Sequence, residues 1–167
     1  EQKGLSLLID SLAGLSERDL TLVILGDGER RIIDALLAKT AHMPGLRVAV
    51  GYDNALSRRL YAAADFFLMP SLFEPCGLSQ MIAMHYGAVP VVRYTGGLKN
   101  TVLDVGYGGC GIVFADYTVS EFVNAVDRAV GLYHSPHMPE IRERAMRQDF
   151  SLKKACLGND CLYKQFV

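Results

Sequence analysis

Residues 70–80 contain a carboxylate that is placed where it could take part in chemistry. Glu74 follows a short apolar run at residues 66–69 and precedes an apolar segment at residues 81–84 that is typical of a helix. The turn between a parallel strand and its following helix lies at the edge where open α/β sheets bind ligands. A carboxylate in such a turn can stabilise a developing cation or bind sugar hydroxyls.

The neighbours of Glu74 support this interpretation. Pro75 and Gly77 would fix the turn, and Phe73 would shield the carboxylate from water. An ordinary exposed loop acid is the alternative, and position alone leaves both interpretations open.

A second turn of the same kind follows about twenty residues later. A strand is predicted at residues 89–93, and Thr95-Gly96-Gly97-Leu98 comes directly after it. Glycines let a ligand approach the backbone closely, and N–H groups at the start of a following helix can hold a phosphate oxygen. A plain tight turn is the alternative, and a P-loop is excluded because no Gly-Lys-Ser/Thr follows. The two adjacent turns together predict a site for a phosphorylated small molecule.

Two isolated side chains could assist such a site. Tyr52 ends a predicted strand, so its ring could stack on a planar base, although a half-buried aromatic at the sheet edge is the alternative. Lys3 precedes the first helical segment and could neutralise a phosphate. From the residues alone, a solvated terminal lysine is the favoured interpretation of Lys3.

The glycines at residues 26–28 do not predict a nicotinamide site. They follow an apolar strand, but the dinucleotide fingerprint requires a third glycine three residues on, and Arg31 stands there instead. A simple turn from strand to helix explains the Gly-Asp-Gly sequence.

The length, composition and net charge of the chain exclude several classes of protein. The chain has 167 residues, half of them hydrophobic, which suffices for one core of ordinary size. Seventeen basic and eighteen acidic residues give a net charge of −1 and no basic stripe, so we expect no nucleic-acid partner. No apolar run approaches the roughly 20 residues of a membrane span, and no signal-peptide pattern is present.

The cysteines and histidines predict neither a disulfide framework nor a metal site. The histidines are far apart and lack metal-ligand spacing. The four cysteines are scattered, so reduced thiols in a cytoplasmic protein are expected, although a bridge between Cys156 and Cys161 stays open.

Strands and helices are predicted to alternate along the chain. We expect strands at residues 20–25, 46–50, 66–69, 89–93 and 111–115, and helices at 5–12 (ended by Gly14), 29–41, 54–64 (capped by Asn54), 81–84, 120–133, 139–148 and 151–166. This order predicts an α/β protein with one Rossmann-like parallel sheet and helices on both faces. Because a helix comes first, we expect residues 1–167 to be one domain whose first strand lies in an earlier part of a longer protein.

Six segments resemble the bacterial glycogen synthases and plant starch synthases in order and spacing, and the likeness covers nearly the whole chain. They are Gln2-Lys3-Gly4-Leu5, Gly51-Tyr52-Asp53, residues 70–80 (PSLFEPCGLSQ), Met84-His85-Tyr86-Gly87, residues 89–93 (VPVVR) and Thr95-Gly96-Gly97-Leu98. The resemblance implies the C-terminal, donor-binding half of a retaining glycosyltransferase of the GT-B fold. The acceptor domain would lie N-terminal to this chain.

The same resemblance implies the reaction. Glucose would pass from ADP-glucose, or UDP-glucose, to the non-reducing end of an α-1,4-glucan with retention of configuration. No metal or other cofactor is implied, and the glucan would bind through the N-terminal domain. The expected compartment is the cytoplasm, or the plastid stroma in a plant.

Roles for individual residues follow from the matching motifs. The resemblance implies that Lys3 stabilises the leaving diphosphate, Glu74 supports the oxocarbenium-like glucose, and Tyr52 stacks on the adenine. The remaining residues implied to line the diphosphate and sugar pocket are Cys76, Gly77, Leu78, Ser79, Thr95, Gly96 and Gly97.

The chain departs from the family pattern at several positions. Asn100 replaces an aspartate, Leu152 a tryptophan, and Ser79 a common threonine, while Ile82 stands where other retaining transferases have a second glutamate. The family's arginine upstream of Lys3 would precede Glu1. We therefore expect this chain alone to bind donor weakly at best and not to elongate glucan.

Two alternatives stay open at this point. One is another retaining GT-B glucosyltransferase, such as a sucrose- or trehalose-phosphate type enzyme. The other is a non-catalytic paralogue that binds nucleotide-sugar or a partner protein.

Overall fold

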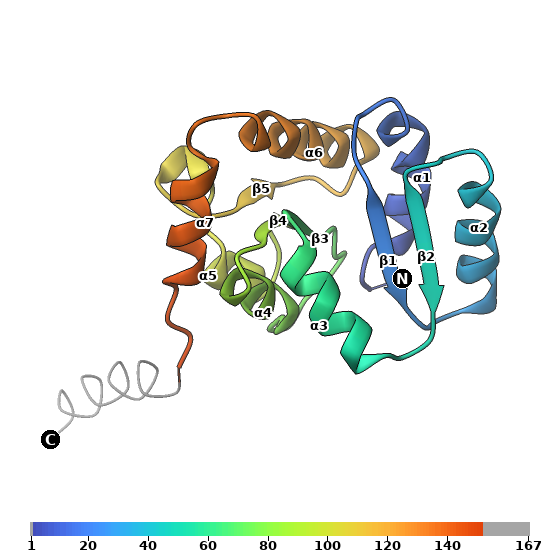
Figure 1. Ribbon diagram of the computed structural model, residues 1–167, viewed down its shortest axis with the longest axis horizontal. Helices are drawn as coiled ribbons and strands as arrows, with labels where there is room; N and C mark the ends of the chain where they lie inside the picture. Colours follow the sequence, from blue (N-terminus) through green and yellow to red (C-terminus); the bar gives the residue numbers. More distant parts are fainter. Residues whose placement is uncertain (1, 152–167) are drawn as a thin grey trace, which may run out of the picture.

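The computed structural model describes residues 2–151, in which helices and strands alternate as predicted (Figure 1). The elements are α1 Leu5–Leu15, β1 Leu22–Gly26, α2 Arg30–Thr40, β2 Leu46–Val50, α3 Asn54–Ala63, β3 Phe66–Met69, α4 Ser79–His85, β4 Val89–Arg93, α5 Leu98–Thr101, a short 3-10 turn Val105–Tyr107, β5 Ile112–Phe114, α6 Val119–Tyr133 and α7 Met138–Met146. Of the helix predicted at residues 151–166, only Ser151 is described, and it is not helical; the rest lies outside the described residues.

Every strand pair in this part of the chain is parallel, which confirms the predicted α/β class. The strands divide into a two-stranded sheet, β1-β2, and a three-stranded sheet in the order β3-β4-β5. Across residues 2–151 no pairing joins β1 to β3, so each has one edge without a strand partner. The strand predicted to precede this chain stays a prediction.

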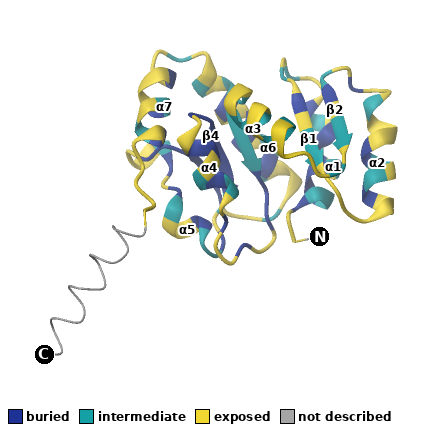
Figure 2. Cartoon of the chain, turned by 60° about the horizontal axis from the view of Figure 1, so that its bottom comes forward, coloured by how far each residue is buried: buried dark blue, intermediate teal, exposed yellow. Residues whose placement is uncertain are grey.

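Helices cover both faces of the three-stranded sheet. Helix α6 contacts β4 and β5 on one face, and α4 contacts β3 and β4 on the other (Figure 1). The side chains of β4 alternate accordingly: Val91 packs in the cluster that contains Phe122 of α6, and Val92 packs in the cluster that contains Met84 of α4. Figure 2 shows β4 as a buried strand. A strand enclosed on both faces reads as a continuous apolar run, which is why its limits were predictable.

Helix α1 runs past the glycine that was predicted to stop it. It ends at Leu15, one residue beyond Gly14. Leu15 is fully buried, and a Cβ at Gly14 would lie 3.4 Å from Val123 of α6. Packing of this last turn therefore outweighs the cost of about 1 kcal/mol that glycine adds inside a helix.

Helix α3 begins where predicted but with a different cap. The carboxylate of Asp53, not the side chain of Asn54, accepts a hydrogen bond from the Leu56 backbone N–H at 2.9 Å. The Asn54 side chain instead accepts a bond from the Tyr52 hydroxyl at 2.9 Å.

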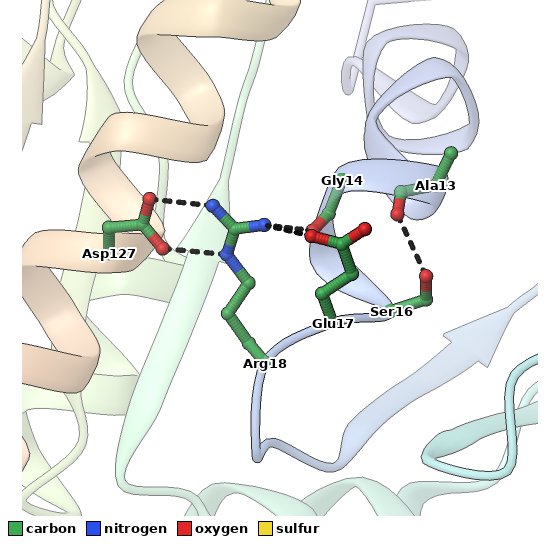
Figure 3. Close-up of polar contacts among 6 residues, drawn as sticks. All are labelled: Ala13, Gly14, Ser16, Glu17, Arg18 and Asp127. Atoms are coloured by element: carbon green, nitrogen blue, oxygen red, sulfur yellow. Dashed lines mark hydrogen bonds and ion pairs between the residues drawn. The ribbon is translucent and has the colours of Figure 1, made fainter.

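An ion pair connects the segment after α1 to α6 (Figure 3). Arg18 donates two hydrogen bonds to the carboxylate of Asp127, each 2.8 Å long, and its third nitrogen donates to the Gly14 carbonyl. This fork joins the chain entering β1 to a helix that covers the other sheet. The hydrogen bond from Arg18 lowers the pKa of Asp127 below its usual value, although partial burial opposes the shift.

We expect Asp127→Asn to lower the thermal stability at neutral pH slightly. Asp127 is partly exposed, so the fall in Tm should not exceed about 3 °C. Because the folded-state pKa is depressed, the ionised carboxylate stabilises the fold above the unfolded pKa, and this is lost as pH falls through the folded pKa. Melting curves should thus show a difference at pH 7 that shrinks below about pH 4.

The matched control is Asp34→Asn. It breaks an exposed ion pair between Asp34 and Arg30, and this pair lies within α2, so it does not connect two elements. Two results would contradict this role of Asp127. In one, the Tm difference between wild type and Asp127→Asn grows as the pH falls; in the other, it equals the Tm difference for Asp34→Asn at every pH.

Candidate functional site

The two turns predicted to form a site lie against each other. They follow β3 and β4, which are parallel neighbours in the register Met69 to Val92, so both turns emerge at the same sheet edge. The Gly97 backbone N–H donates to the Glu74 carbonyl at 2.8 Å. A Cβ on Gly96 would lie 1.9 Å from that carbonyl oxygen, so only glycine allows this approach.

Glu74 is a buried carboxylate with a cationic partner. It is 4% exposed, and its Oε2 accepts a hydrogen bond from Lys3 Nζ at 2.5 Å. Burial of a carboxylate is costly unless the charge is paired, and Lys3 supplies that pairing. The structure thereby brings together two residues that lie 71 positions apart in the sequence.

Backbone contacts hold Lys3 at this position. The Leu72 N–H donates to the Gln2 carbonyl at 3.0 Å. Gly4 adopts φ 75°, and a Cβ there would lie 1.9 Å from the Pro70 carbonyl oxygen. The segment before α1 is therefore pressed against the segment that follows β3. Lys3 is not the freely solvated lysine that the residues alone favoured.

The predicted shielding of Glu74 by Phe73 does not describe the structure well. Phe73 is an exposed side chain, whereas Lys3 and the turn at Gly96 and Gly97 lie directly against Glu74. Lys3 and the Gly96–Gly97 turn, which come from two other segments, thus enclose the Glu74 carboxylate more than its sequence neighbour Phe73 does.

The remaining residues of the first turn differ in exposure. Cys76 and Leu78 are exposed, Gly77 is buried with φ 76°, and Ser79 begins α4 half-buried. Cys76 and Leu78 are thus the residues of this turn that are accessible at the sheet edge next to Glu74. In the second turn Thr95 is buried.

The two cysteines in the described part of the chain are both free thiols. Cys76 is exposed and Cys110 is buried, and burial raises the pKa of the Cys110 thiol. Cys156 and Cys161, for which a bridge was left open, lie outside the described residues.

Tyr52 lies on the other sheet, after β2. Its ring is 88% exposed, and its hydroxyl donates to Asn54 rather than to either turn. The structure therefore presents a free aromatic face at the carboxyl end of β2, but does not bring it into the cluster around Glu74. The interpretation of Tyr52 as half-buried is wrong.

Residues that were not predicted also support the two turns. The Arg93 guanidinium donates to the carbonyls of Ser71, at 2.9 Å, and Leu72, just upstream of Glu74. It also lies over the Tyr117 ring, 5.6 Å from the centroid. The only signal in the sequence was an arginine at the end of a buried strand, which by itself suggests no such contact.

Within residues 2–151, no group of three or more His, Cys, Asp or Glu residues is placed to hold a metal ion. In the same part of the chain, no helix has both the length and the apolar character required to cross a membrane.

Comparison with known proteins identifies the family. Residues 1–131 match the family model described as glycosyl transferases group 1. The chain belongs to the group 1 glycosyl transferases. The two turns and the Lys3–Glu74 pair are thus features of a glycosyl transferase of this group, and its neighbours of known structure have the GT-B fold.

The chain is similar to bacterial glycogen synthases. The chain is 43% identical over 161 residues to that of Desulfitobacterium hafniense, covering 93% of this chain and 34% of the relative. It is 44% identical over 168 residues to that of Myxococcus xanthus, covering 99% of this chain and 35% of the relative. The chain thus spans about a third of the length of these relatives.

A solved structure is similar over the same extent. It is the catalytic domain of starch synthase IV from Arabidopsis thaliana bound to ADP and acarbose, with a TM-score of 0.86 and 32% identity. The match covers 98% of this chain and 36% of that chain.

Proposed function

We propose that this chain is the donor-binding part of a glycogen- or starch-synthase-type glucosyltransferase. The complete protein would transfer glucose from ADP-glucose, or UDP-glucose, to the non-reducing end of an α-1,4-glucan with retention of configuration. The observation that carries this proposal is the ion pair between the exposed Lys3 and the buried carboxylate of Glu74, at the sheet edge where the two turns meet. The similarity to bacterial glycogen synthases and to a starch synthase supports it.

The charges suit departure of a nucleoside diphosphate from glucose. Glu74 would stand beside the sugar, where a fixed carboxylate stabilises positive charge that develops at the anomeric carbon. The Lys3 side chain is 58% exposed, so its Nζ has room to donate a second hydrogen bond, to a phosphate oxygen, and so stabilise the leaving diphosphate. The residues proposed to line the diphosphate and sugar are Cys76, Gly77, Leu78, Ser79, Thr95, Gly96 and Gly97.

We propose that the transfer needs no metal ion or other cofactor. The glucan acceptor would bind mainly to the part of the complete protein that corresponds to the relatives' remaining length. The cytoplasm, or the plastid stroma in a plant, is the setting in which these substrates would be used.

Substitution of Tyr52 tests whether the base of the nucleotide-sugar stacks on this side chain. Calorimetric titration of the chain with ADP and ADP-glucose should show binding that Tyr52→Ala weakens about tenfold, because stacking of a base on an aromatic ring contributes roughly 1–3 kcal/mol. Tyr52→Phe, which keeps the ring, should bind like the wild type. UDP-glucose in a parallel titration would show which donor is preferred.

Tyr107 provides a matched control for this titration. Its ring is 82% exposed, but it lies in the 3-10 turn at residues 105–107. Tyr107→Ala should leave the affinity unchanged. Equal affinity of Tyr52→Ala and the wild type would refute stacking on Tyr52, and equal losses from both variants would show that the effect is not local.

A further inference from the structure

A buried glutamine connects the two turns from behind. Gln80 of α4 is 0% exposed, although its side chain is polar. Its Nε2 donates to the Gly77 carbonyl at 2.5 Å and to Thr101 Oγ1 at 3.0 Å. Thr101 Oγ1 in turn donates to the Gly97 carbonyl at 3.1 Å. The Gln80 amide and the Thr101 hydroxyl thus form a chain of hydrogen bonds from the Gly77 carbonyl to the Gly97 carbonyl.

The orientation of the Gln80 amide follows from its neighbours. Besides Gly77, the Cys76 carbonyl lies 3.4 Å from Nε2. Rotating the amide by half a turn would place Oε1 against these carbonyl oxygens and leave them without a donor. Oε1 is consequently left buried without a partner, close to where a Cβ on Gly77 would lie.

Direct backbone contacts complete the link between the turns. A Cβ on Gly97 would lie 2.4 Å from the Cys76 carbonyl oxygen, and the Gly97 N–H donates to the Glu74 carbonyl. Gly97 therefore contacts the first turn through its N–H and Cα, while its carbonyl accepts hydrogen bonds from the Thr101 hydroxyl and the Asn100 N–H. A shift of one turn relative to the other would break the hydrogen bond between Gln80 and Thr101 and that between the Gly97 N–H and the Glu74 carbonyl.

We infer that Gln80 and Thr101 are positioning residues that lock the Glu74–Gly77 turn to the Gly96–Gly97 turn. The two turns are then held in one fixed geometry relative to each other, and this geometry would receive the diphosphate and the sugar of a nucleotide-sugar. The inference rests on the proposed function for the identity of the ligand, but the lock itself is a property of the unliganded chain. Neither residue contacts the ligand in this account.

The test uses Thr101→Val, which keeps the shape of the side chain but removes the hydroxyl, and Thr101→Ser, which restores it. Thr101→Val removes the two hydrogen bonds that join the hydroxyl to Gln80 and to Gly97. In the complete protein it should raise the KM for nucleotide-glucose at least about 3- to 10-fold, the range expected for the net loss of a single hydrogen bond. The KM for glucan should stay unchanged, and Thr101→Ser should return the donor KM to the wild-type value. A role in general stability would not separate the two substrates in this way.

Thr40→Val is the matched control. Thr40 Oγ1 also donates to a carbonyl of its own helix, that of Leu37 at 2.7 Å, but in α2 and away from both turns. The Thr40→Val variant should therefore have the same KM for nucleotide-glucose as the wild type. A donor KM that is unaffected by Thr101→Val, or raised equally by Thr40→Val, would overturn the inference.

Amide hydrogen exchange tests the lock without any ligand. In the 167-residue chain, Thr101→Val should speed exchange at Gly97, whose N–H donates to Glu74, by about 3- to 10-fold, while Thr40→Val should not. Unchanged exchange at Gly97 would overturn the lock, whatever the protein binds. Faster exchange in a protein that binds no nucleotide-sugar would support the lock and refute the proposed function instead.

Discussion

Glu74→Gln should lower the rate of glucose transfer by the complete protein about 10²- to 10³-fold, the usual loss when one preorganised electrostatic contact to a transition state is removed. Glutamine fills the same volume and can still accept a hydrogen bond from Lys3, but it carries no charge to stabilise a developing cation. The measurement is the kcat for incorporation of glucose into glucan, with ADP-glucose and UDP-glucose as donors.

Glu140→Gln is the control for this substitution. It removes the charge of an acid that pairs with Arg144 on the surface of α7 and should leave kcat within about twofold, because it is remote from the two turns. Full activity of Glu74→Gln would contradict the role proposed for this carboxylate. Inactivity of the complete wild-type protein would favour the non-catalytic paralogue.

We expect Gly96→Ala to have the largest effect on stability among the substitutions considered. A Cβ at this position would lie 1.9 Å from the Glu74 carbonyl oxygen, and the backbone has φ 46°, which alanine adopts only at a cost. The backbone strain and the forced displacement together should lower the free energy of unfolding by about 2–5 kcal/mol. Donor binding should be lost with it, because the displaced turn carries Glu74.

Gly28→Ala separates this clash from the general effect of adding a methyl group to a glycine turn. Gly28 also lies between a strand and a helix, but a Cβ there meets nothing within 4 Å. Urea unfolding should show a change within about 0.5 kcal/mol for Gly28→Ala. If Gly96→Ala unfolded at the same urea concentration as Gly28→Ala, the close approach of the two turns would be wrong.

Sequence reasoning predicted the limits of β2, β3 and β4 as the structure has them. Enclosure on both faces explains the continuous apolar run of β4, whereas β2 is buried only at Leu46. The end of α1 was missed because it depends on contact with Val123, more than a hundred positions away. The division into two sheets was missed for the same reason, since pairing between strands leaves no trace in any single segment.

The candidate site was predictable to a similar degree. Alternation of strands and helices places the turns at Glu74 and Gly96 at one sheet edge, so their proximity follows from topology. The pairing of Lys3 with Glu74 does not, because from the residues alone Lys3 looked like a solvated lysine. Gln80 and Thr101 act through backbone carbonyls, and no residue type predicts which carbonyl it will meet.

Two of the departures from the family pattern, Ser79 and Asn100, lie next to the two turns, and the Asn100 N–H donates to the Gly97 carbonyl at 3.2 Å. Asn100 is exposed in α5, and Leu152 lies beyond the described residues. Ser79 keeps the hydroxyl of the threonine it replaces. None of these positions makes a hydrogen bond to Glu74 or Lys3 within the described part of the chain.

The most direct test of a donor site at this sheet edge is an amide NMR titration of the chain with ADP-glucose. We expect saturable shifts concentrated at residues 74–79 and 95–98, with smaller shifts at Lys3 and Tyr52. Saturable shifts confined to other parts of the chain, or none in a folded sample at millimolar donor, would contradict it.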